Sequence, residues 1–189
     1  MRATRLCHTA VRDSKRMKNT ATLEMPTGTE NEAELSIPLD LSQWVACSQL
    51  GEWIKEDVGA LNWNNPELLA ALRRQPEYEP RVLLQTLVLG YATGVFGAEE
   101  IERHCATNPD FRAVRPKFSP RPVELKQFRR ENLGLLKWCL VKVITRALTS
   151  QFIERDEIGV LPPGLRRHVV ENATERMDLA RHMDRSAAL

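Results

Sequence analysis

The sequence predicts an all-α protein: a small helical bundle with a helix-turn-helix-like unit, a disordered N-terminal arm and a C-terminal amphipathic helix. Three observations lead to this prediction. Apolar residues recur at spacings of three and four through the middle of the chain. Prolines stand where several of these periodic segments begin. No segment alternates polar and apolar residues for long enough to form a sheet.

Composition divides the chain into four parts. Residues 1–38 contain few core-forming side chains, so we expect a disordered basic and polar arm. Residues 39–152 hold most of the large aliphatic side chains and should form the helical domain. Residues 153–164 contain two prolines and two glycines and should be a linker. Residues 165–189 should form a charged amphipathic helix that ends in a short tail.

The first periodic segments predict short helices. Residues 41–58 have the apolar spacing of one or two amphipathic helices, with their tryptophans on the core side. Asn65, Pro66 and Glu67 form a helix start, and this helix should end near Gln75 because Pro76 disfavours helical geometry in the residue before it.

A central helix is predicted from Pro80 onward, and it is apolar around most of its circumference, so it should be buried. Gly90 and Gly94 lie four residues apart, which would let another backbone approach closely. The alternative is that Gly94 and Gly97 only end the helix. The next helix, after Gly97, has an acidic first turn that suits the positive end of a helix dipole.

A basic segment follows, from Arg112 to Arg130, with a predicted helix at its end. Ser119 or Arg121 precedes a proline at the helix start. Leu125 and Phe128 should anchor this helix to the core, and a separate face is formed by Val123, Lys126, Gln127 and Arg130. The last helix of the domain should follow a cap at Asn132 and carry an apolar stripe to residue 152.

No catalytic centre, metal site or cofactor-binding motif is predicted. The four cysteines, Cys7, Cys47, Cys105 and Cys139, are far apart and form no C-x-x-C pair, which argues against a disulfide framework or a zinc ribbon. No apolar run is long enough to span a membrane. A cytoplasmic protein with reduced thiols is therefore expected.

The order of motifs from Tyr78 onward resembles a known family. The pattern Y-x-P-R-x-L-L-x-x-L-x-L-G-Y-x-T-G-V is followed by E-I-E-R, then N-x-x-F-R, then F-R-R. From about residue 77 to about residue 148 this is similar to the N-terminal domain of InsH-type insertion-sequence transposases, which are bacterial DDE enzymes. One departure is the run Arg121-Pro122-Val123-Glu124, which replaces an acidic-His-Ser/Thr run and removes the usual hydroxyl caps.

The resemblance implies a helical domain that helps to recognise transposon ends. In this family a catalytic domain follows, with three carboxylates that hold two metal ions on a β-sheet. The stretch after Ser150 is shorter than the roughly 100 residues that such a domain needs. We therefore expect a DNA-binding, non-catalytic transposase N-terminal-like protein rather than an enzyme.

The expected partner is double-stranded DNA, with Gln127 and Arg130 at base edges because Gln can pair with adenine and Arg with guanine. The expected phosphate contacts are Arg112, Lys117, Arg121, Lys126 and Arg129. The alternative is a solvated basic face, or pairing of the arginines with the acidic helix at 99–102.

A competing hypothesis is a helical interaction or oligomerisation protein that modulates a full-length transposase. Its surfaces would be the exposed C-terminal helix and the apolar central helix, and its partner would be a second copy or the transposase. A third hypothesis is a decayed transposase fragment.

Overall fold

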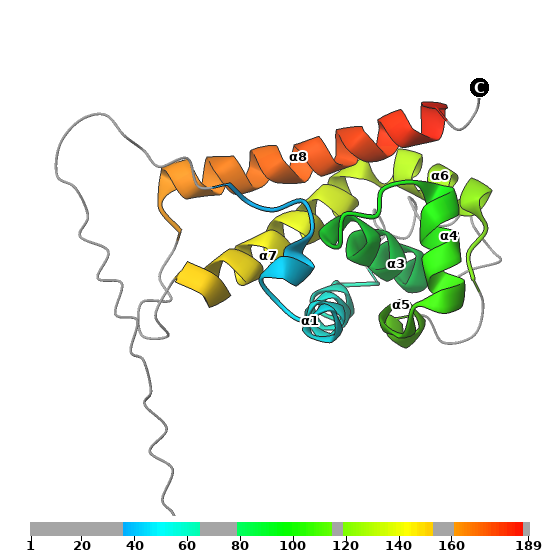
Figure 1. Cartoon of the computed structure of the whole chain (residues 1–189), viewed down its shortest axis with the longest axis horizontal. Coiled ribbons are helices and arrows are strands. Elements are labelled where there is room, and N and C mark those ends of the chain that lie inside the picture. The colour runs from blue at the N-terminus through cyan, green and yellow to red at the C-terminus, as the bar shows by residue number, and fades with distance from the viewer. Residues whose placement is uncertain (1–35, 65–78, 115–118, 153–160, 187–189) are drawn as a thin grey trace, which may run out of the picture. The chain divides into compact units, whose positions relative to one another are not determined.

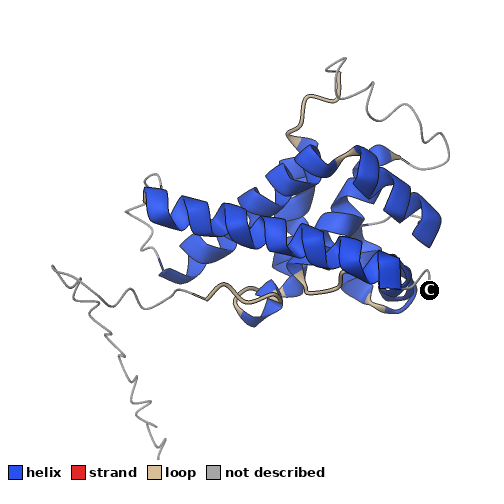
Figure 2. Cartoon of the chain, turned by 90° about the horizontal axis from the view of Figure 1, so that it is seen from above, coloured by secondary structure: helices blue, strands red, loops and turns tan. Residues whose placement is uncertain are grey.

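The computed structural model describes residues 36–64, 79–114, 119–152 and 161–186, which form a bundle of helices (Figures 1 and 2). In chain order the elements are η1 (Leu41–Gln43), α1 (Cys47–Gly59), α3 (Pro80–Ala92), α4 (Ala98–Thr107), α5 (Pro109–Val114), α6 (Pro122–Glu131), α7 (Leu133–Phe152) and α8 (Pro163–Ser186). Within these ranges there is no β-strand, only an isolated bridge between Asp40 and Thr93. The all-α bundle is confirmed. The predicted helix at 65–75, the arm up to residue 35 and most of the linker lie outside the described residues.

α3 is the centre of the bundle, as its composition predicts. Pro80 occupies its first turn, and the side chains of Leu83, Leu84, Leu87 and Tyr91 have no exposed surface. α1 and α7 pack most extensively on it, and α5, α6, α4 and α8 also contact it. A helix that is apolar on nearly every side needs neighbours on nearly every side, and this one has them.

The chain turns sharply after α3, and its two glycines serve different contacts. A Cβ at Gly90 would lie 3.0 Å from both Ile101 of α4 and the carbonyl oxygen of Val95. Gly94 has φ +75°, a conformation that glycine adopts without steric cost, and it lies close to the backbone of residues 39 and 40. The expected close approach of another backbone therefore occurs at Gly94, so ending the helix is not the only role of this residue.

α8 is part of the core, whereas the sequence led us to expect a separate, exposed helix after a linker. It lies along α7 and also contacts α3 (Figure 1). Its buried apolar side chains are Val169, Ala173, Met177 and Ala180. These positions recur at spacings of three and four, which places them on one helical face. The linker also ends earlier than predicted, because α8 begins at Pro163 and Leu161 is already buried.

Arg176 connects α8 to two distant segments of the chain. Its side chain has no exposed surface. Its guanidinium donates to the carbonyl oxygens of Pro38 at 2.5 Å, Leu39 at 2.5 Å and Tyr91 at 2.6 Å, and to the side chain of Asn172 at 2.8 Å. The backbone of residues 38 and 39, together with the end of α3, is thereby held against α8.

The folded unit, to which Arg176 binds this segment, begins earlier in the chain than the sequence predicts. Ile37, which the sequence placed in the polar arm, is buried, and its carbonyl accepts from Asn172 at 3.5 Å. Desolvation lowers the pKa of Arg176 to about 10, an effect that the nearby carboxylates of Glu175 and Asp40 oppose. The group therefore remains a cation at neutral pH, and carbonyl dipoles rather than a carboxylate solvate it.

Replacing Arg176 by Met should destabilise the fold by roughly 3 kcal/mol, because several buried carbonyl groups would lose their donor. Urea denaturation followed by circular dichroism measures this loss. The control is Arg167→Met on the exposed side of the same helix, which should change the unfolding free energy by no more than about 0.5 kcal/mol. Equal stabilities for the two variants would contradict the clamping role of Arg176.

Candidate nucleic-acid interface

The start of α6 is capped by its own first turn. Pro122 occupies the first helical position, and the Glu124 carboxylate accepts the backbone N–H of Arg121 at 2.8 Å. The same carboxylate pairs with the Arg121 guanidinium at 2.6 Å. The run Arg121-Pro122-Val123-Glu124 thus supplies half of a capping box, with the glutamate reaching back to the residue before the helix. The absence of a hydroxyl cap does not displace the helix start.

α6 has a buried face and an outward face. Leu125 and Phe128 are buried, as predicted, and fix the helix against the core. Val123, with 60% of its surface exposed, and Arg130 point outward, and Lys126 lies half-buried between these faces. The outward face therefore carries cations on a helix that packs mainly on α4, α3 and α7.

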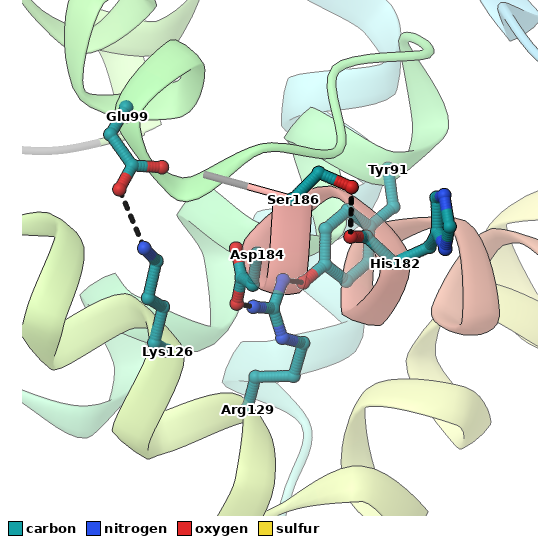
Figure 3. Close-up of polar contacts among 7 residues, drawn as sticks. All are labelled: Tyr91, Glu99, Lys126, Arg129, His182, Asp184 and Ser186. Atoms are coloured by element: carbon teal, nitrogen blue, oxygen red, sulfur yellow. Dashed lines mark hydrogen bonds and ion pairs between the residues drawn. The ribbon is translucent and has the colours of Figure 1, made fainter. Parts of the chain in front are cut away.

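Arg129 lies on the buried face, so the phosphate contact predicted for it does not fit the structure. Only 2% of its side chain is exposed. Its guanidinium donates to the hydroxyl of Tyr91 at 2.8 Å and forms an ion pair with Asp184 of α8 (Figure 3). Arg129 therefore joins α6 to α3 and α8, and it is Arg130, one residue later, that reaches the surface.

Tyr91 is the residue on which these contacts converge. Burial raises the pKa of its phenol to about 12, and the nearby Arg129 cation offsets part of that effect. The phenol is therefore neutral at physiological pH and its oxygen can accept from Arg129. Its backbone carbonyl accepts from Arg176, so one residue of α3 binds two buried arginines.

A basic groove lies between α6 and the last turns of α8. It has a volume of about 420 Å³ and is lined by Val123, Lys126, Arg129, Arg130, Arg181, Asp184 and Arg185. Five of these residues are cations and one is a carboxylate. Arg129 and Asp184 are the least exposed and neutralise each other. The open part of the groove is consequently positive.

The remaining four cations of the groove differ in their partners. Lys126 bonds to Glu99 of α4 at 2.5 Å, and Arg181 pairs with Asp178 at 3.2 Å. The hydrogen bond from Lys126 is the main reason that the pKa of Glu99 lies below its usual value. Arg130 and Arg185 form no ion pair or side-chain hydrogen bond with any other described residue. Pairing with the acidic helix was the alternative considered for the arginines, and in the structure the residue that pairs with it is a lysine, Lys126.

The other predicted contact residues do not all gather at this groove. Arg112 lies on α5 and donates to the carbonyl of Thr107, at the opposite end of α4 from Glu99, about 12 Å away along the helix. The amide nitrogen of Gln127 donates to Glu131 at 3.1 Å, so it is engaged within α6. Lys117 lies outside the described residues.

Sequence reasoning missed Arg181 and Arg185, because it treated α8 as an appendage. A signal was present: the apolar stripe of α8 predicts a packing face, and a helix packed on the domain can add its charged side chains to the domain's surface. The stripe does not say which helix α8 meets, so it could not have placed the arginines beside α6.

The two surfaces of the competing interaction hypothesis are covered within the chain. α3 is buried by its neighbours, and the apolar face of α8 packs against α7 and α3. Among the described residues the large apolar side chains that remain exposed are Leu39, Val123, Trp138, Val170 and Met183. Oligomerisation therefore stays a prediction, and these two surfaces do not support it.

None of the described thiols lines the groove. Cys105 and Cys139 are buried, and desolvation followed by the nearby Asp57 raises the pKa of Cys139 to about 12. In the parts of the chain that the structure describes, no three His, Cys, Asp or Glu side chains converge as a metal ion would require. None of the helices described here is long and apolar enough to cross a membrane.

No family model, curated protein or solved structure matches this chain. Functional inference therefore depends on the chemistry of the groove and on the sequence motifs.

The Arg129–Asp184 pair should couple strongly in a double-mutant cycle. Asp184→Asn leaves a buried guanidinium without its carboxylate, which should cost about 3–5 kcal/mol of unfolding free energy. Arg129→Met in the same chain should recover much of that loss, as measured by urea denaturation. Asp178→Asn, which breaks an exposed pair, should cost no more than about 1 kcal/mol. Additive losses from Arg129→Met and Asp184→Asn would show that the two residues do not interact.

Tyr91 should titrate unusually late. We expect an absorbance step at 295 nm near pH 12 that disappears in Tyr91→Phe, because the buried phenol resists ionisation. The pKa is higher in the fold than in the unfolded chain, so the stabilisation by the neutral phenol is complete below about pH 10 and is lost as the pH rises to about 12. Tyr78→Phe is the control, and a late step that survives Tyr91→Phe would refute the assignment.

Proposed function

We propose that this chain binds duplex DNA, without catalysing a reaction on it, through the outward face of α6 and the basic groove beside it. The observation that carries the proposal is the concentration of exposed cations there, with Arg130 and Arg185 lacking any carboxylate partner among the described residues. A net charge of only +2 over the whole chain makes this local concentration more informative. Contacts between backbone phosphates and arginine or lysine side chains supply most of the binding energy in such complexes.

The shape of α6 suits the major groove, which admits one α-helix. Its exposed positions Val123 and Arg130 are seven residues apart and therefore lie on one face about two turns apart. Arg130 can donate to the O6 and N7 atoms of guanine, and Val123 can contact a thymine methyl group. Lys126, one turn before Arg130, would exchange its exposed pair with Glu99 for a phosphate, at small cost.

α6 would meet DNA as a pre-positioned element. Its inward residues Leu125 and Phe128 are buried, and Arg129 is bonded to two other helices. A helix that is already ordered loses little conformational entropy on binding.

Transposon ends are the target class that the sequence motifs favour. The region from about residue 77 to about residue 148 resembles the N-terminal domains of InsH-type transposases, and it contains α3, α4, α5, α6 and most of α7. The proposed role is therefore recognition of such ends.

Fluorescence anisotropy with a labelled random-sequence duplex tests the binding. Log affinity should fall linearly with log salt, with a slope of roughly −3.5 or steeper if four or more phosphates are bound. Lys126→Ala/Arg130→Ala should weaken binding and make the slope shallower by about 1 for each phosphate that the variant no longer binds.

The matched control is Lys55→Ala/Arg81→Ala, which removes the same charge from exposed ion pairs on α1 and α3. It should leave the slope unchanged. Binding that does not respond to salt, or equal effects of the two double variants, would overturn the proposed site.

A further inference from the structure

We infer that α8 is a DNA-contacting element. Arg181 and Arg185 bind one backbone phosphate of the DNA strand that runs through the protein groove between α6 and α8. This inference rests on the proposed function and extends it to a helix outside the basic segment of the sequence. Both arginines line the groove together with Lys126 and Arg130. The groove thus has a cationic wall on each side, one from α6 and one from α8.

The two arginines are placed to act together. They lie four residues apart, so their side chains project from the same face of α8 one turn apart. Both are exposed, while Asp184 between them is mostly buried against Arg129. A phosphate oxygen in the groove would therefore meet guanidinium groups before it meets the carboxylate.

The nearby negative charges are already compensated. Asp184 is paired with Arg129, and Asp178 is paired with Arg181 at 3.2 Å across an exposed contact. An exposed pair of this kind contributes at most about 1 kcal/mol, so Arg181 can turn to a phosphate at little cost. The C-terminal end of α8 carries a partial negative charge, and Arg185 in its last turn offsets it.

The distance between the two walls is set from within the fold. The Arg129–Asp184 pair and the Arg129–Tyr91 hydrogen bond join α6, α8 and α3 beneath the groove (Figure 3). Arg130 on α6 and Arg185 on α8 each follow one of these buried residues directly in sequence. Their backbone positions are therefore held by the buried contacts, and a ligand finds the two cations already arranged.

The test is the double variant Arg181→Ala/Arg185→Ala, measured by anisotropy with the random-sequence duplex over a range of salt concentrations. Because the two guanidinium groups hold one phosphate, removing both should make the salt slope shallower by about 0.9 and weaken binding about tenfold at 0.1 M salt. The control is Arg81→Ala/Arg167→Ala, which removes the same charge. Arg167 lies on α8 itself, about 27 Å from Arg185 along the helix axis. Circular dichroism should show both variants folded, since all four arginines are exposed.

The outcomes separate this inference from the proposed function. Weaker binding with a shallower slope in Arg181→Ala/Arg185→Ala alone supports the role of α8. If Lys126→Ala/Arg130→Ala impairs binding while the α8 variant matches its control, duplex binding stands and the role of α8 is overturned. If the wild-type chain fails to bind the duplex, or binds an RNA duplex of the same sequence more tightly, the proposed function fails and this inference fails with it.

Discussion

Two buried guanidinium groups converge on a single residue of the central helix, and the arrangement of the other helices depends on them. Arg176 of α8 donates to the carbonyl of Tyr91, and Arg129 of α6 donates to its hydroxyl. A buried cation is costly unless polar groups surround it. Backbone carbonyl groups surround Arg176. Arg129 is bonded to the carboxylate of Asp184 and to the phenol of Tyr91. Because these partners come from distant segments, satisfying the two charges fixes how α3, α6 and α8 meet.

This interior arrangement determines the surface. Successive residues of a helix point about 100° apart, so the chain that buries Arg129 exposes Arg130. The same relation holds on α8, where Asp184 points inward and Arg185 outward. Joining the two inward residues in one ion pair brings the two outward arginines to opposite sides of one groove. The positive groove and the buried pair are therefore two consequences of a single helix–helix contact.

Periodicity alone predicted much of the fold. It located the buried central helix, the inward residues Leu125 and Phe128, and the helix that became α7, because a one-dimensional pattern determines which face of a helix is apolar. The spacing places Arg129, four residues after Leu125, on the inward face, but it does not show the carboxylate that compensates a buried guanidinium, because Asp184 lies far along the chain. It also left α8 outside the domain, because the pattern shows a packing face without showing its partner. Two of the residues expected to contact phosphate therefore lie away from the outward face of α6: Arg129 is interior, and Arg112 is on α5. The arginines of α8 that line the groove were not among the expected residues.

We propose that duplex DNA occupies the groove between α6 and α8. Hydrogen–deuterium exchange of the full chain, with and without a saturating random-sequence duplex, tests it most directly. We expect added protection in α6 (Pro122–Glu131) and in the last two turns of α8, with no change in the first turns of α8 around Arg167. Protection confined to α1, or spread evenly over α8, would contradict the claim.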